Sequence, residues 1–206
     1  WASIVANTRI FLASGINPAL SPNAHEVTLA AVKAAHRAGK LVAFDINYRS
    51  KLWDTKTAER VLREYFPYVS ILFTSGGDAA DVLGFSKPPG EDLALRISDE
   101  LGIPTVCLVY GPVPDSSALW RVVCSCHGKT YAAEQTGTLN TVDRLGAGDA
   151  FAGGFLTGFL EQGPELGVQM GNAVMTLKQT YKGDIAWVTR EHVATQLAGT
   201  AGMIER

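Results

Sequence analysis

Short apolar runs alternate with helical segments over the first half of the chain, and this alternation constrains the fold more than any other feature. The runs Leu41–Ile46, Ser70–Thr74 and Thr105–Tyr110 are apolar at nearly every position rather than at every second one. Strands of this kind are buried on both faces, which is typical of a parallel sheet covered by helices. The sequence therefore predicts an α/β fold with a mainly parallel sheet.

The other elements follow from periodicity, capping residues and turn residues. We expect a further strand over Arg9–Ser14, and a hairpin of Ala118–Cys124 and Lys129–Ala133 that turns at His127-Gly128-Lys129. Helices are predicted over Pro22–Ala38, Thr55–Tyr68, Asp78–Leu83, Glu91–Leu101, Ala150–Leu160, Glu165–Tyr181 and Arg190–Leu197.

Length and charge exclude several classes of protein. A chain of 206 residues, 47% of them hydrophobic, suits one globular domain over residues 1–206, which buries roughly 70% of its unfolded surface. The net charge is −2 and basic residues form no block, so we expect no nucleic-acid partner. Apolar stretches fall well short of the ~20 residues that cross a membrane, and we expect neither membrane partner nor signal peptide.

The three cysteines are few and odd in number, which argues against a disulfide framework and favours the cytoplasm. The segment Cys124-Ser125-Cys126-His127 has two interpretations, a metal site or a pair of buried strand thiols. The second is favoured, because no further ligand pair completes a structural zinc site. We expect His25, His36 and His192 to be solvated.

A glycine-rich turn, Asp143 to Gly153, opens one predicted helix and carries the strongest chemical signal. The small residues Gly146, Ala147 and Gly148 leave their N–H groups free to face one point, where the helix dipole attracts an anion such as phosphate. A carboxylate at Asp149 would repel a phosphate that is merely held. Phosphoryl transfer does need such a group, to take the proton of the attacking hydroxyl. The alternative is an ordinary helix start with Asp in its first turn.

Polar residues follow the apolar strands at their carboxyl ends, where ligands bind in α/β sheets. Asp45, Asn47 and Arg49 alternate along the chain, so we expect them on one face, and Arg49 can grip a carboxylate or a phosphate with two hydrogen bonds. Thr74–Asp78 and Tyr110–Gly111 occupy matching places. The alternatives are a solvated strand end and, for Thr74–Asp78, an ordinary strand-to-helix loop with an N-cap.

The segment Asp143-x-x-Gly-Ala-Gly-Asp-Ala-Phe resembles the C-terminal signature of the ribokinase-like (PfkB) carbohydrate kinases. Asp45 to Trp53 and Ser14 to Ser21 resemble segments of the 2-keto-3-deoxygluconate kinases within that family. The resemblance implies a ribokinase-like three-layer α/β/α sandwich. This chain would be its C-terminal two-thirds, the ATP-binding part, truncated at the N-terminus and without the lid.

The resemblance also implies a reaction and a division of roles. ATP would phosphorylate a hydroxyl of a sugar acid, 2-keto-3-deoxygluconate to its 6-phosphate, with Mg²⁺ and K⁺ as accompanying ions. Asp149 would be the general base, with the amides of Gly146, Ala147 and Gly148 around the γ-phosphate. The sugar acid would be bound by Arg49, Asn47, Asp45 and Asp149. Nucleotide contacts would come from Ser75, Asp78, Tyr110, Gly111, Gly146, Gly148 and Asn172, with Asp78 at Mg²⁺ and Asp143 at a monovalent cation.

The sequence departs from the family pattern in three places. Ser75-Gly76-Gly77-Asp78 stands where the family has an N-x-x-E motif, the loop Tyr110–Ser117 has two prolines and no lysine, and Arg144 replaces a frequent threonine. The alternatives are a kinase of another sugar or nucleoside, such as ribose or fructose, and a fragment that binds nucleotide without turnover. The full-length protein could also be a homo-oligomer.

Overall fold

The computed structural model describes residues 1–85, 91–111, 118–136 and 140–199. The chain forms two compact units, each described by itself below. The first unit contains Trp1–Val109 and Cys124–Thr130, and the second contains Tyr110–Val123 and Tyr131–Arg206. Our assignment of residues 1–206 to one domain stays a prediction.

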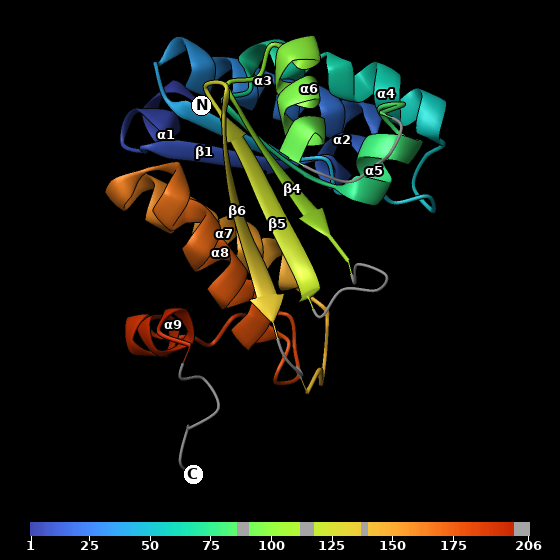
Figure 1. The fold of residues 1–206 in the computed structure, drawn as a ribbon. Helices are drawn as coiled ribbons and strands as arrows, with labels where there is room; N and C mark the ends of the chain where they lie inside the picture. The colour runs from blue at the N-terminus through green and yellow to red at the C-terminus, as the bar shows by residue number, and fades with distance from the viewer. Residues whose placement is uncertain (86–90, 112–117, 137–139, 200–206) are drawn as a thin grey trace. The chain divides into compact units, whose positions relative to one another are not determined.

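The first unit is built on parallel strands, as the apolar runs predicted (Figure 1). Hydrogen bonds join neighbouring strands in chain order: β1 (Ile10–Ser14), β2 (Leu41–Asp45), β3 (Ile71–Ser75) and β4 (Thr105–Tyr110). Ser14 is paired with Asp45, and Ser75 with Val109. The carboxyl ends of the strands therefore meet at one edge of the sheet, and polar residues that follow them are brought to that edge.

Consecutive residues of the inner strands are buried, which confirms that both faces of the sheet are covered. Val42, Ala43 and Phe44 of β2 have no exposed surface, and Leu72 of β3 has none either. A strand with one solvated face would show exposure at every second position. The α/β class predicted from the sequence is correct.

The helices and the short 3₁₀ helix of the first unit differ from the prediction in several places, and the first two helices were not predicted at all. They are α1 (Ala2–Ala6), α2 (Ile16–Leu20), α3 (Pro22–Arg37), α4 (Thr55–Arg63), η1 (Phe66–Tyr68), α5 (Gly76–Asp81) and α6 (Glu91–Leu101). The single helix predicted over Thr55–Tyr68 is wrong: α4 ends at Arg63, and the chain resumes as η1 because Pro67 has no N–H for an α-helical bond. Helix α5 begins two residues earlier than predicted, because Ser75 is its N-cap.

The predicted hairpin is present, with longer strands: β5 (Ala118–Cys126) and β6 (Lys129–Thr136) continue the sheet after β4. His127 and Gly128 between them have φ values of 48° and 76°. Two successive positive φ values are the mark of the two-residue turn that matches the twist of a hairpin. The turn lies where the His127-Gly128-Lys129 sequence predicted it.

The second unit contains α7 (Ala147–Gln162), α8 (Pro164–Lys178) and α9 (Arg190–Leu197). Helices α7 and α8 lie side by side and touch through glycines (Figure 1). A Cβ atom on Gly158 would lie 2.6 Å from the Leu166 carbonyl oxygen, and one on Gly154 would lie 2.8 Å from that of Met170. The main chains of the two helices are therefore in direct contact.

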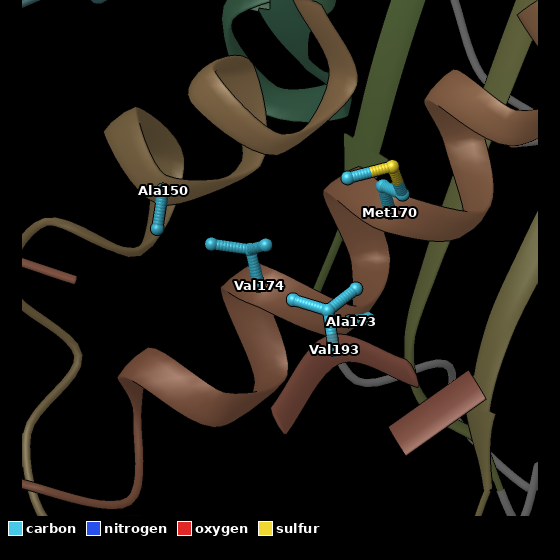
Figure 2. Close-up of a cluster of buried hydrophobic side chains, with 5 residues drawn as sticks. All are labelled: Ala150, Met170, Ala173, Val174 and Val193. Atoms are coloured by element: carbon cyan, nitrogen blue, oxygen red, sulfur yellow. The ribbon is translucent and has the colours of Figure 1, made fainter. Parts of the chain in front are cut away.

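A small apolar cluster joins these three helices (Figure 2). It consists of Ala150 from α7, of Met170, Ala173 and Val174 from α8, and of Val193 from α9. All five side chains are less than one-tenth exposed. The cluster packs α9 against α8 and includes Ala150 from the first turn of α7, just after the glycine-rich turn.

The three thiols lie where the buried-thiol interpretation expects them, and one histidine does not lie where it was predicted. Cys107, Cys124 and Cys126 are free and buried, and burial raises the pKa of the Cys107 thiol. In the described segments no three His, Cys, Asp or Glu residues are grouped so as to hold a metal ion. The prediction of a solvated His25 is wrong: its Nδ1 lies 2.9 Å from the Tyr65 hydroxyl, and its Nε2 lies 3.5 Å from the Glu64 carboxylate.

Helices long and apolar enough to cross a membrane are absent from the segments that the structure describes.

Candidate active site

The turn before α7 depends on a glycine at position 146. Gly146 is the N-cap residue of α7 and has φ of 76°, a value that side chains other than glycine rarely adopt. A Cβ atom there would lie 2.1 Å from the carbonyl oxygen of Asp184. The turn and the segment after α8 are thus in main-chain contact, which fixes the place at which α7 begins.

Asp143 joins that turn to two other segments of the second unit. Its Oδ1 accepts from Leu145 N–H at 2.9 Å, and its Oδ2 accepts from Gly183 N–H at 3.0 Å. The hydrogen bonds from Leu145 and then Gly183 lower the pKa of the Asp143 carboxyl. The main-chain oxygen of Asp143 accepts from the Lys178 ammonium at 2.9 Å. Asp143 therefore orders the turn that precedes Gly146.

One of the three amides predicted to surround a phosphate already has a partner within the turn. Gly148 is exposed, and among the described residues beyond its chain neighbours and its own helix no atom lies within 4 Å of a Cβ built on it. It stands in the first helical turn, where N–H groups lack intrahelical acceptors. Gly146 lies beside it as the N-cap. The N–H of Ala147, however, donates to the Arg144 carbonyl oxygen at 3.1 Å. This amide is used to close the turn, so the cradle of three amides is corrected to Gly146 and Gly148.

Asp149 is exposed in the first turn of α7 and lines a cavity of about 510 Å³. Met170, Val174 and Val193 form an apolar part of its wall, and they belong to the cluster in Figure 2. Thr157, Thr189 and Arg190 supply polar groups. An apolar hollow with a few polar groups is the usual form of a small-molecule site. The carboxylate that the sequence selected is therefore open to a ligand.

The nucleotide residues predicted in the second unit are partly brought together. Gly111 and Arg144 share one neighbour: a Cβ on Gly111 would lie 4.0 Å from the Trp120 ring, and the Arg144 guanidinium lies 4.6 Å from the centre of that ring. Tyr110 ends β4 and is buried. Residues 112–117 of the unusual loop lie outside the described residues.

Asn172, the remaining nucleotide residue, lies on α8. Its Oδ1 is buried and has no hydrogen-bond partner among the residues that the structure describes. A buried acceptor without a donor is costly, and each such group calls for an explanation. An N–H donor of a bound base would supply the missing partner.

In the first unit, the end of β2 departs from the predicted geometry. The strand ends at Asp45, whose carbonyl oxygen accepts from Gly15 N–H at 2.7 Å. Asn47 has φ of 43°, so the extended backbone does not continue to Arg49. The prediction that Asp45, Asn47 and Arg49 share a face is wrong, because alternation of side chains requires a continuous strand. Arg49 is exposed, and its Nη1 donates to the Tyr48 carbonyl oxygen at 3.2 Å.

Asp78 connects this segment to the start of α5. Its Oδ2 accepts from Tyr48 N–H at 3.3 Å, and its own N–H donates to the Ser75 hydroxyl at 2.9 Å. Burial raises the pKa of the Asp78 carboxyl, against the hydrogen bond from Tyr48 and the positive charge of Arg49, which lower it. Mg²⁺ is usually bound by one or two carboxylates together with substrate phosphates. A single carboxylate at Asp78 fits a Mg²⁺ that arrives with a nucleotide.

Each unit thus gathers its own part of the predicted site. Ser75, Asp78 and Arg49 meet in the first unit, and Asp143, Gly146 and Asp149 in the second. The sequence assigned no role to Lys178, which is fully buried and donates a hydrogen bond to Asp143. Its place near the end of a largely apolar predicted helix is a signal that could have found it.

The chain is similar to known proteins over most of its length. The family described as pfkB family carbohydrate kinase matches residues 1–190. A 2-dehydro-3-deoxygalactonokinase of Haloferax volcanii is 35% identical over 98% of this chain and 61% of its own length. A 2-dehydro-3-deoxygluconokinase of Haemophilus influenzae is 27% identical over 90% of this chain and 58% of its own.

Among solved structures, the 2-dehydro-3-deoxygluconokinase of Thermotoga maritima superposes with a TM-score of 0.87 at 26% identity. The match covers 97% of this chain and 62% of that one. A putative ribokinase II from E. coli, 18% identical with a TM-score of 0.78, shows the same fold. The chain spans about three-fifths of the length of these relatives. It belongs to the pfkB family of carbohydrate kinases.

Proposed function

We propose that this chain carries the ATP-binding and phosphoryl-transfer part of a kinase that acts on a 2-dehydro-3-deoxy sugar acid. The relatives from Haloferax and Haemophilus are named for substrates of that class, one the galacto and one the gluco form. Phosphorylation of 2-keto-3-deoxygluconate to its 6-phosphate is the reaction that the sequence motifs favour. The galacto form is a second substrate to test, because the 35% identical relative is named for it.

The observation that carries the proposal is the start of α7. Gly148 is bare and exposed at the helix N-terminus, and Asp149 follows it and lines the cavity. The amides of Gly146 and Gly148, with the helix dipole, would stabilise charge on the γ-phosphate during transfer. Asp149 would take the proton of the attacking hydroxyl as the general base. An anion-binding helix start that only held phosphate would be weakened by this carboxylate.

Residues of the first unit would bind the sugar acid and the Mg²⁺ ion. Arg49 suits the planar carboxylate of a sugar acid, since a guanidinium can donate two parallel hydrogen bonds to it. Asn47 and Asp45 would contact its hydroxyls. Asp78 would hold a Mg²⁺ ion, which supplies positive charge against phosphate oxygens when it is bound. Ser75 would support that residue, because its hydroxyl oxygen accepts a hydrogen bond from the Asp78 N–H group.

Tyr110, Gly111 and Asn172 would contact the nucleotide from the second unit. Support comes from the unpartnered acceptor of Asn172 and from the exposed main chain at Gly111. The loop Tyr110–Ser117 contains no lysine, so the phosphates would have less positive charge around them than in family members that carry that lysine. We therefore expect a weaker dependence of ATP affinity on salt than in relatives with that lysine.

A panel assay tests the proposal directly. The 206-residue chain is incubated with ATP, Mg²⁺ and one acceptor at a time: 2-keto-3-deoxygluconate, its galacto epimer, fructose and ribose. Formation of ADP and of a sugar phosphate is followed by ³¹P NMR. We expect phosphate transfer to the sugar acids in preference to the neutral sugars. Transfer to neutral sugars alone would favour the kinase of another sugar, and ATP binding without transfer would favour the inactive nucleotide-binding fragment.

A further inference from the structure

Lys178, the last residue of α8, has no exposed surface, which is unusual for a lysine. Burial of an ammonium group is costly unless neighbouring groups compensate its charge. Its Nζ donates to the main-chain oxygen of Asp143 at 2.9 Å. The ammonium therefore lies at the loop that leads into the glycine-rich turn, and not on the surface.

Three features of the second unit stabilise the charge there. The Asp143 carboxylate is close enough for Lys178 to lower its pKa, after the larger effects of the Leu145 and Gly183 amides. The ring of Tyr181 lies 5.7 Å from Nζ, with the ammonium over its face. Lys178 also stands at the C-terminus of α8, where the helix dipole favours a positive charge.

The family resemblance places a monovalent cation at Asp143, and the residues present do not suit one. Such a cation needs oxygen ligands, and each carboxylate oxygen of Asp143 already accepts one main-chain N–H, which leaves fewer lone pairs for a metal. Its carbonyl oxygen accepts from the ammonium. A metal cation at these oxygens would lie beside a buried charge of the same sign, which repels it.

We propose that the Lys178 ammonium is the resident cation of the glycine-rich turn and takes the place of K⁺ at Asp143. Lys178 touches neither substrate nor reacting atoms in this arrangement, so it is a positioning residue. It fixes the carbonyl of Asp143, while the N–H of Asp143 is held by the carbonyl oxygen of Gln179 at 3.2 Å. The loop is thus attached to the end of α8 on both sides of one residue, three positions before Gly146.

The role of this cation in catalysis rests on the proposed function, but its effect on the fold does not. Thermal unfolding is therefore the primary measurement, with KCl compared with choline chloride at equal ionic strength. We expect the unfolding midpoint of the unmodified chain to be the same in both salts. Lys178→Met should lower the midpoint by about 4 °C or more, and KCl should restore part of the loss. Lys178→Arg, which keeps the charge, should lose less.

Lys182→Met is the matched control, since Lys182 is an exposed lysine four residues further along. It should leave the midpoint unchanged in either salt. A midpoint of the unmodified chain that rises specifically with KCl would overturn the proposal, and this arm holds even if Lys178→Met does not fold. A Lys178→Met variant that folds and has the same unfolding midpoint in KCl and in choline chloride would also overturn the proposal. Where transfer is measurable, kcat of the unmodified chain should be independent of K⁺; absence of transfer would count against the proposed function alone.

Discussion

Replacing Gly146 by alanine should destabilise the second unit through two separate effects. Alanine at φ of 76° enters the left-handed region, which costs about 1–2 kcal/mol. Its Cβ would also lie 2.1 Å from the oxygen and 2.8 Å from the carbon of the Asp184 carbonyl, which are main-chain atoms that no rotamer change can move. Overpacking of this kind costs about 1–3 kcal/mol. The free energy of unfolding should therefore fall by about 2–5 kcal/mol.

For a chain of this size that loss corresponds to a decrease in Tm of about 4–20 °C. The assay is thermal unfolding followed by far-UV circular dichroism. ATP binding should weaken as well, because the 183–184 segment must move and the turn with it.

Gly148→Ala is the control, two residues away. The position is exposed and has no positive φ, and the described part of the chain outside its own helix places no atom within 4 Å of a built Cβ. Alanine in a helix is favoured over glycine by up to about 1 kcal/mol, so Tm should stay level or rise. The reasoning is refuted if Gly146→Ala unfolds within about 1 kcal/mol of the unmodified chain, or if Gly148→Ala is equally destabilised.

Four further predictions follow from the site and the helices. Asp149→Asn should lower kcat by about 10²–10⁴ and leave ATP affinity unchanged by calorimetry, and retention of a third of kcat would exclude it as the base. Arg49→Lys should lower kcat/KM for 2-keto-3-deoxygluconate roughly 10- to 150-fold relative to fructose, and an unchanged ratio would mean that Arg49 reads no carboxylate. The pKa of Asp78 is raised in the folded chain, so its ionised carboxylate opposes folding and the opposition disappears as the pH falls and the group is protonated. Asp78→Asn should therefore raise Tm at pH 7. A gain in Tm that persisted below pH 3 would show that it does not come from removing the charge. Gly158→Ala should lower stability by about 1–3 kcal/mol, whereas Gly153→Ala, exposed and without near atoms, should not.

The sheet could be predicted because its signal is local and repeated. Each inner strand is apolar at consecutive positions, and that pattern has one common explanation, a parallel strand covered on both faces. The hairpin turn was equally readable, since His127-Gly128 tolerates two positive φ values. The prediction of one long helix over Thr55–Tyr68 is wrong because the apolar periodicity continues through Pro67. Proline has no N–H for an α-helical hydrogen bond, and this effect outweighs the apolar pattern.

The site was harder to predict because its geometry depends on main-chain detail. The positive φ of Asn47 cancels the alternation that Asp45 and Arg49 suggested. The hydrogen bond from the Ala147 N–H to the Arg144 carbonyl oxygen closes the turn, and the glycine pattern does not predict it. Lys178 is separated from Asp143 by 35 positions, so its hydrogen bond depends on the return of α8 to the turn. The types of residue in the site suggest its chemistry. Which of them lie next to each other can be seen only in the folded structure.

The contact between α7 and α8 has a consequence for how Asp149 is held. Side chains at most helix interfaces can exchange rotamers, so two helices can slide by small amounts at little cost. Gly154 and Gly158 instead bring main chain against main chain, where there is no rotamer to exchange. The end of α8 returns to the turn that begins α7, through Lys178 and Asp143. The two helices are therefore connected at both places, through the glycine contacts and through Lys178. The first turn of α7, which carries the proposed base, can unwind only if α8 shifts as well.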